Sequence, residues 1–236
     1  MVLRTLTDNV ESGMTTKELD RIAERELRAL GGTSSFKGYR GYPASLCVSI
    51  NEEVVHGIPG NRIIKDGDLV SLDFGAIVDG YHGDSAVTVA IGEIGVQAQN
   101  LLRATQGALS AGIAAARAGG RLGDISQAVQ QYAESRGFGV VREYTGHGIG
   151  RAMHEEPLVP NFGQAGTGPE LKSGMTLALE PMLTTGDWHT RVGADNWVVY
   201  TSDRSMAAHF EHTVAVTPQG GEVLTVSTIG NDRENG

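Results

Sequence analysis

The chain has 236 residues, of which 40% are hydrophobic and 20% are charged, as in a globular protein with a sizeable core. Its formal net charge of −9 argues against a nucleic-acid-binding surface as the main activity. The single cysteine, Cys47, excludes an internal disulfide and suits a reducing compartment. Neither a membrane-spanning apolar stretch nor a signal-peptide pattern is found, so we expect a cytoplasmic protein without membrane contact.

The predicted elements are a mixture of helices and strands. A capping box at Thr15-Thr-Lys-Glu18, apolar residues at helical spacing and closing glycines predict three helices, at about 15–31, 96–117 and 124–137. Strand patterns cover 45–50, 69–77, 81–91, 175–179, 197–201 and 209–216. Because these elements do not follow the short regular cycle of a parallel doubly wound sheet, we predict an α+β fold.

Parts of the chain recur in the same order about a hundred residues apart. Gly13 and Asp73, for example, correspond to Gly119 and Glu180. This order predicts two halves related by a pseudo-dyad, each contributing helices and a hairpin to a shared sheet. We expect a single domain, 1–236, with pseudo-symmetric halves at approximately 13–95 and 119–217.

Each half contains a pair of acids at the inner ends of apolar strands. Asp73 and Asp84 form the first pair, and Glu180 and Glu211 form the second. Buried acids are costly unless a cation binds them, so the two pairs predict one site for divalent metal. The alternative is four surface acids on exposed strand faces, which their apolar flanks argue against. Carboxylates joined by one or two imidazoles suit Mn, Fe, Co or Zn, among which the sequence does not choose.

A tight turn brings the acids of the first pair together. Asp79-Gly80 is typical of a two-residue hairpin, which would set Asp73 opposite Ala86. Asp73 and Asp84 then lie on one face of the hairpin as diagonal neighbours, with room for a metal ion between their side chains.

Three of the seven histidines lie in loops rich in glycine and proline: His56, His147 and His154. Glycines beside His147 let the backbone approach a site closely, and they exclude a helical zinc-protease motif. One imidazole of the pair His147 and His154 can therefore bind metal while the other faces substrate. His82 and His209 precede the second acid of each pair by two residues. We expect packed, hydrogen-bonded histidines there, with orientation of a carboxylate as the alternative.

Eight segments together carry a family resemblance, which extends from about Gly13 to Val216. They are Gly41-Tyr-Pro-Ala-Ser-Leu-Cys-Val-Ser-Ile-Asn51, Val55-His-Gly-Ile-Pro59, Leu72-Asp-Phe-Gly75, Gly83-Asp84, Gly146-His-Gly-Ile-Gly150, His154-Glu-Glu-Pro157, Leu179-Glu-Pro181 and Phe210-Glu-His-Thr213. In combination they resemble the type I methionine aminopeptidases, which are pita-bread metallopeptidases. The resemblance implies two pseudo-symmetric halves around a curved antiparallel sheet.

The resemblance also implies a site for two divalent metal ions, Co, Mn, Fe or Zn. The five implied ligands are Asp73, Asp84, His147, Glu180 and Glu211, of which Asp84 and Glu211 would bridge both ions. Asp73 would complete the first ion, and His147 with Glu180 the second. Two divalent cations nearly balance four carboxylates and a bridging hydroxide, which agrees with this assignment.

The implied activity is removal of the N-terminal (initiator) methionine from nascent proteins and peptides, by attack of a hydroxide that bridges the two metal ions. A small second residue would be preferred. His154 would stabilise the oxyanion, His56 would contact the scissile amide or leaving side, and Glu180 would transfer a proton. The methionine pocket would include Tyr39, Tyr42, Cys47 and Trp197. Ordinary packing is the alternative role for the two tyrosines.

Three features differ from the family pattern. The chain begins close to the Gly13 helix, so most of the usual first helix would be absent. Met153 stands where an aromatic residue is frequent, which would loosen one pocket wall. His209 stands where glutamine is common and adds a titratable group near Glu211, which would alter metal affinity or pH dependence. No implied ligand is missing.

Two alternative functions are compatible with the same fold. An X-Pro aminopeptidase or prolidase would carry an additional N-terminal domain, for which this chain has no room. A non-catalytic protein that binds ribosomes, nucleic acid or histones would be expected to lose metal ligands and to be less acidic. We therefore expect a monomeric enzyme that acts on the N-terminal methionine of nascent peptides, contacts ribosomes transiently and has no direct nucleic-acid function.

Overall fold

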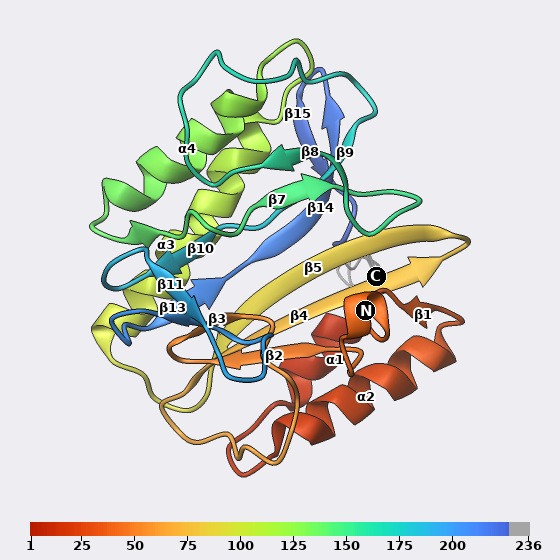
Figure 1. Ribbon diagram of the computed structural model, residues 1–236, viewed down its shortest axis with the longest axis vertical. Coiled ribbons are helices and arrows are strands. Elements are labelled where there is room, and N and C mark those ends of the chain that lie inside the picture. The colour runs from red at the N-terminus through yellow and green to blue at the C-terminus, as the bar shows by residue number, and fades with distance from the viewer. Residues whose placement is uncertain (227–236) are drawn as a thin grey trace, which may run out of the picture.

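The computed structural model describes residues 1–226 (Figure 1). Its helices are α1 (Val2–Asn9), α2 (Thr16–Ala29), α3 (Val96–Ala115) and α4 (Leu122–Glu134), with a short 3-10 helix η1 (Tyr39–Gly41). The largest sheet has the strand order β1 (Thr33–Ser34), β4 (Leu69–Val78), β5 (Tyr81–Ala90), β14 (Glu211–Thr217), β9 (Thr176–Leu179), β7 (Gly146–Gly148) and β8 (Glu155–Val159). Two more of its strands pair outside this path, β2 (Cys47–Ile50) with β4 and β15 (Gly220–Val223) with β14.

Two smaller sheets complete the described strands. One contains β13 (Ala207–His209), β10 (Met182–Thr184) and β6 (Gly139–Val140), and the other contains β11 (Thr190–Val192), β12 (Val199–Thr201) and β3 (Glu53–Val55). Every pair of neighbouring strands in the three sheets is antiparallel. The predicted α+β class is confirmed.

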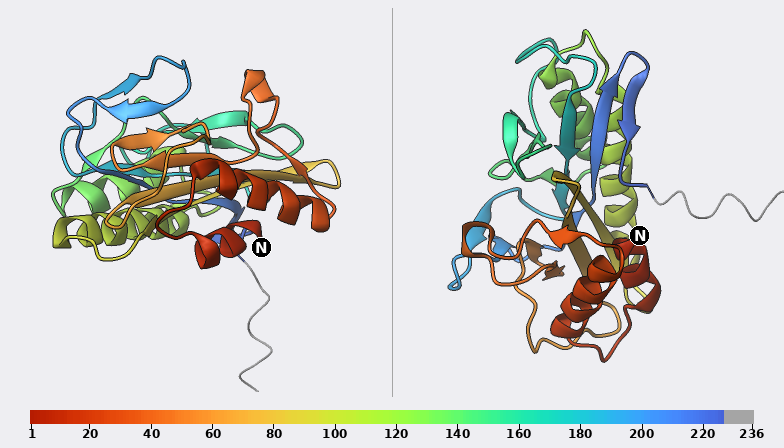
Figure 2. Two further views of the ribbon diagram at one scale, coloured as in Figure 1. Left: turned by 90° about the horizontal axis from the view of Figure 1, so that it is seen from below. Right: turned by 90° about the vertical axis from the view of Figure 1, so that its right-hand side faces the viewer.

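The helices lie on one face of the large sheet, whereas η1 and the β11–β12 hairpin project from the other (Figure 2). On the helical face, Leu6 of α1 and Leu19 of α2 pack against Leu72 of β4, and all three are fully buried. Ile125 of α4 packs in a second cluster with Val214 of β14. Each such buried side chain contributes about 1.5–3 kcal/mol, so this packing holds the helices on one face of the sheet and leaves the other face uncovered by them.

The first long helix begins as its sequence predicts. The Thr15 backbone N–H donates to Glu18 Oε2 at 2.7 Å, and the Glu18 N–H donates to Thr15 Oγ1 at 3.3 Å, which completes the capping box. The helix ends before Gly31, which adopts a left-handed φ of 75°.

The β4–β5 hairpin has the predicted turn and register. Asp79 and Gly80 adopt φ values of 51° and 78°, as a two-residue turn of the mirror-image type requires. Asp73 pairs with Ala86, and Gly75 pairs with Asp84. The expectation that the two acids share one face is thereby confirmed.

The two hairpins that carry the acids meet at the centre of the large sheet, where β5 pairs with β14 and Ala86 lies opposite Glu211. Thr213 joins them through its hydroxyl, which donates to the Asp84 carbonyl and accepts the Asp84 N–H, both at 2.9 Å. The boundaries of the two predicted halves stay a prediction.

Some expected elements differ from the structure. The eight-residue helix α1 (Val2–Asn9) precedes Gly13, and the expected absence of most of the family's first helix stays a prediction. The predicted strand 209–216 is two strands in different sheets, separated at Phe210, because the chain passes there from one sheet into another. Of the two- and three-residue strands, β12 lies within the predicted strand 197–201 and β13 overlaps the start of the predicted strand 209–216. The others were not predicted, since such short segments carry no periodic signal. Within residues 1–226, no helix is long and apolar enough to cross a membrane.

Candidate active site

A pocket opens on the sheet face that the helices do not cover. Its lining residues come from η1, the large sheet and the loops around it: Phe36, Tyr39, Arg40, Tyr42, His56, Asp73, Asp84, His147, Met153, His154, Glu180, Trp197 and Glu211. Ten of these thirteen are predicted site residues, which is every one of them except Cys47. Met153, which the sequence also placed beside the pocket, is another. The tertiary structure therefore collects residues from both halves of the sequence at one place.

Four carboxyl groups lie together at the base of the pocket. Asp73, Asp84 and Glu211 are buried, with 9%, 4% and 2% of their surface exposed, and the side chain of Glu180 is 15% exposed. Burial raises the pKa of Asp84 to about 7. Burial and the charge of Asp84 raise the pKa values of the other three acids well above their usual range.

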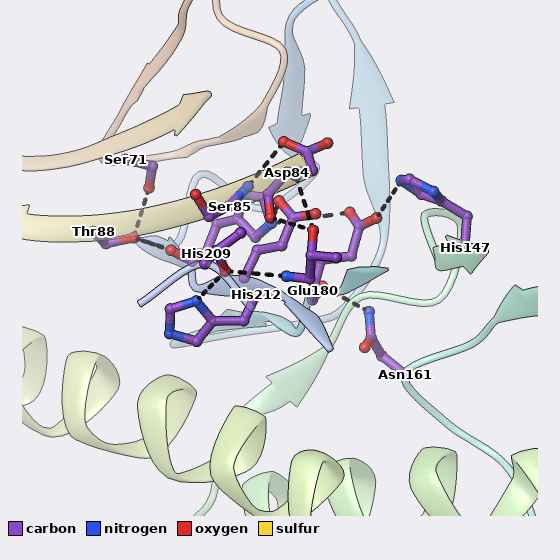
Figure 3. A network of polar contacts seen from close by, with 12 residues as sticks. Ser71, Asp84, Ser85, Thr88, His147, Asn161, Glu180, His209 and His212 are labelled. Carbon is purple, nitrogen blue, oxygen red and sulfur yellow. Dashed lines mark hydrogen bonds and ion pairs between the residues drawn. The ribbon is translucent and has the colours of Figure 1, made fainter. Parts of the chain in front are cut away.

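His147 adds a nitrogen donor to the acids. Its Nε2 lies 3.7 Å from Glu180 Oε1, and its Nδ1 lies 2.8 Å from the Gly148 carbonyl oxygen (Figure 3). Because that carbonyl can only accept a hydrogen bond, we place the proton of His147 on Nδ1 and its lone pair on Nε2, which faces the carboxylates. Burial lowers the pKa of His147, which favours the neutral form that binds metal.

The geometry of these groups fits a metal centre. Donor atoms of Asp84, His147 and Glu211 all lie within 4.8 Å of one another. Among the described residues, Asp73 Oδ1 and Glu211 Oε1 are buried and have no hydrogen-bond partner. Unpartnered buried carboxylate oxygens are costly, and a bound cation removes this cost.

His154 and His56 lie above the carboxylates in the same pocket. The ring of His154 stacks on Tyr39 at a centroid distance of 5.3 Å and lies 4.1 Å from the ring of His147. The Tyr39 hydroxyl lies 2.9 Å from His154 Nδ1. Partial burial and the neighbouring His147 lower the pKa of His154, and burial lowers the pKa of His56 to about 4.

Aromatic rings form one wall of the pocket. Tyr42 meets Trp197 edge to face, with ring centroids 5.0 Å apart, and its hydroxyl donates to the carbonyl oxygens of Leu46 and Gly57. Cys47 is not among the lining residues but packs in the apolar cluster beside Tyr42 and Met153. Burial raises the pKa of the Cys47 thiol, so this group is a packing residue rather than a nucleophile.

Two lining residues, Phe36 and Arg40, were not predicted from the sequence. Phe36 precedes the Gly38–Gly41 loop that carries Tyr39, and Arg40 lies within it. Their proximity to Tyr39 is the signal that could have identified them.

The two histidines that precede the acids differ in structure. His82 is hydrogen-bonded as expected, with its Nδ1 at 2.9 Å from Ser35 Oγ. For His209 the expected hydrogen bond is wrong, because neither ring nitrogen has a partner among the described residues although the side chain is buried. His209 Nε2 instead lies 3.9 Å from Glu180 Oε2 and 3.8 Å from Glu211 Oε2 (Figure 3).

The fold and the donor set are those of a metallopeptidase. Residues 1–218 match metallopeptidase family M24, and the chain belongs to this family. It is 50% identical to methionine aminopeptidase 1 of Bacillus subtilis over 220 residues, which cover 93% of this chain and 89% of the relative. The structure of methionine aminopeptidase from Thermotoga maritima aligns with a TM-score of 0.94 and 44% identity, over 96% of this chain and 91% of that one.

A more distant structure shares the fold. The Xaa-Pro dipeptidase from Bacillus anthracis aligns with a TM-score of 0.75 and 25% identity, over 96% of this chain but 57% of that chain. The predicted pita-bread fold and the resemblance to methionine aminopeptidases are thereby confirmed.

Proposed function

We propose that this protein is a methionine aminopeptidase that removes the N-terminal methionine from peptides and nascent proteins with a small second residue. The observation that carries the proposal is the set of buried, unpartnered carboxylate oxygens beside His147 at the base of an aromatic pocket. The 50% sequence identity to methionine aminopeptidase 1 of Bacillus subtilis supports the reaction class.

The donor set fits two divalent metal ions from among Mn, Fe, Co and Zn. The residues that would hold them are Asp73, Asp84, His147, Glu180 and Glu211. When bound, the ions would supply Lewis acidity that polarises the scissile carbonyl and lowers the pKa of a water molecule.

His154 is suited to stabilise negative charge on the scissile carbonyl oxygen. We assign the Tyr39 hydroxyl as the donor to His154 Nδ1, which leaves the proton of the neutral imidazole on Nε2. The lowered pKa of His154 favours this neutral state, so Nε2–H donates to the oxyanion that forms when the carbonyl is attacked.

His56 and Glu180 act on the amide and on the proton. His56, whose lowered pKa keeps it neutral, would contact the scissile amide or the leaving side. The carboxylate of Glu180 would take up a proton and later deliver it to the departing amine.

The aromatic wall would select methionine. Tyr42 and Trp197 present ring edges and faces in a pocket that also contains Met153, and a thioether packs well against such rings. Tyr39 would serve both this pocket and His154.

The test compares peptides after metal loading. We expect metal-free protein loaded with Mn, Fe, Co or Zn to release methionine from Met-Gly peptides much faster than from Met-Leu peptides, with no cleavage of Ala-Pro peptides. Preference for Ala-Pro would contradict the proposal in favour of an X-Pro aminopeptidase. Intact metal binding with no release from any peptide would favour a non-catalytic binding protein.

We further propose that the protein acts in the cytoplasm as a monomer and contacts ribosomes transiently. The support is its expected substrate, because nascent chains emerge there. Sedimentation of the protein by itself tests the monomeric state, and sedimentation together with translating ribosomes tests the ribosome contact.

A further inference from the structure

Arg40 places a positive charge at the rim of the pocket. It is exposed, and it is the only lysine or arginine among the lining residues that the structure describes. The other charged lining residues are the four acids at the base. Metal ions would balance those acids, whereas the charge of Arg40 has no counterpart within the pocket.

The backbone holds Arg40 in an unfavourable conformation. Its φ and ψ are 48° and 21°, in the left-handed region, between Gly38 and Gly41 with φ values of 88° and 90°. Residues in such conformations cluster at binding sites, where the surrounding structure maintains them. Helix η1, which carries Arg40, stands above the sheet on the open face (Figure 2).

The side chain of Arg40 is directed beside the proposed substrate contacts. Its Cζ lies 5.4 Å from the ring centroid of Tyr39, and the Tyr39 hydroxyl contacts His154. Within residues 1–226 the guanidinium forms no hydrogen bond and no ion pair, so its N–H donors are available to a ligand. An extended peptide advances by about 3.3–3.6 Å per residue, so a residue shortly after the second one of a substrate is within reach of the pocket rim.

We propose that Arg40 is a specificity-determining residue that favours substrates with an acidic side chain shortly after the small second residue. The inference rests on the proposed function. The guanidinium of Arg40 would donate two parallel, charge-assisted hydrogen bonds to the carboxylate of that side chain.

The experiment measures kcat/KM for methionine release from pentapeptides of the type Met-Ala-Ser-Ser-Ser, in which Asp, Asn or Lys replaces each serine in turn. For the wild-type protein we expect Asp to exceed Lys by about two- to fivefold at one or two adjacent positions, as for an exposed ion pair. The preference should decrease at 0.5 M salt because of screening.

Three variants identify the source of the preference. Arg40→Gln should lose it, and Arg40→Lys should keep part of it. Arg103→Gln removes the same charge from α3 on the opposite face and should behave as the wild type. The inference would be overturned if Arg40→Gln kept the full preference for Asp over Lys. It would also be overturned if the wild type released methionine without any such preference. Failure of the wild type to release methionine from any peptide would instead overturn the proposed function.

Discussion

His209 is the residue whose surroundings differ most from those its sequence position predicts. It is buried, its two ring nitrogens have no hydrogen-bond partner within the described part of the chain, and Nε2 faces Glu180 and Glu211. Burial lowers its pKa to about 3, so the ring is neutral and offers a single N–H donor. The Nε2–oxygen distances of 3.8 and 3.9 Å are slightly longer than a hydrogen bond, and a small shift of either carboxylate closes the gap.

His209 should therefore position carboxylates that bind metal. We expect His209→Leu to weaken metal affinity by about tenfold, because the outer partners of metal ligands typically have effects of this size. His209→Gln, which keeps an N–H donor, should retain most of the affinity. Competition with a chromogenic chelator measures both values. Wild-type affinity in the leucine variant would show that His209 only fills space.

At the scale of elements, the tip of the β4–β5 hairpin holds the loop that carries Met153 and His154. The Arg151 guanidinium donates to the Tyr81 hydroxyl at 2.8 Å and lies 4.5 Å from the centroid of its ring. The backbone N–H of His82 donates to the Gly150 carbonyl oxygen at 2.7 Å. The first acid-bearing hairpin thus supports a loop from the second half of the chain.

Loss of this contact should impair catalysis without unfolding the protein. An exposed cation–π contact with a hydrogen bond contributes about 1 kcal/mol, so Tyr81→Ala should lower kcat/KM by about fivefold. Tyr81→Phe keeps the ring and should have a smaller effect. Hydrogen exchange of residues 150–154 should increase in the alanine variant. Val78→Thr, on the same hairpin and also exposed, is the control; an equal loss there would contradict a specific role for Tyr81.

At the scale of the whole molecule, the buried acids oppose folding when no metal is bound. The pKa of Asp84 is raised to about 7 in the folded chain from an ordinary value of 3.8, because burial disfavours the charged form. A raised carboxyl pKa contributes stability below the ordinary value, and this stability is lost as the pH rises towards the folded value. The other three acids are shifted in the same direction.

Metal should reverse this pH dependence. We expect the midpoint temperature of metal-free protein to fall by about 5–10 °C between pH 5 and pH 8, since a few kcal/mol of stability are lost. With saturating metal it should stay level or rise, because metal competes with protons for the same oxygens. Differential scanning calorimetry measures both curves. A flat curve for the metal-free protein would contradict the raised pKa values.

Local sequence patterns predicted much of the framework. The Thr15–Glu18 capping box and the Asp79-Gly80 turn are specified by neighbouring residues, and the turn fixes the register of β4 and β5 by counting alone. The resemblance also assembled the acids and loop histidines that the pocket brings together. Their metal-binding and catalytic roles stay predictions.

Only the tertiary structure decided how distant segments meet. The break at Phe210 between β13 and β14 depends on two separate sheets, which strand periodicity does not encode. Two contacts join segments that lie far apart in the chain: His209 with Glu180, and Arg151 with Tyr81. The position of Arg40 at the rim likewise depends on a pocket that distant segments build. The sequence by itself determined the chemical groups and the local turns, because these depend on residue type and short spacing. The structure determined burial and proximity, which arise only when the whole sheet and its loops are packed together.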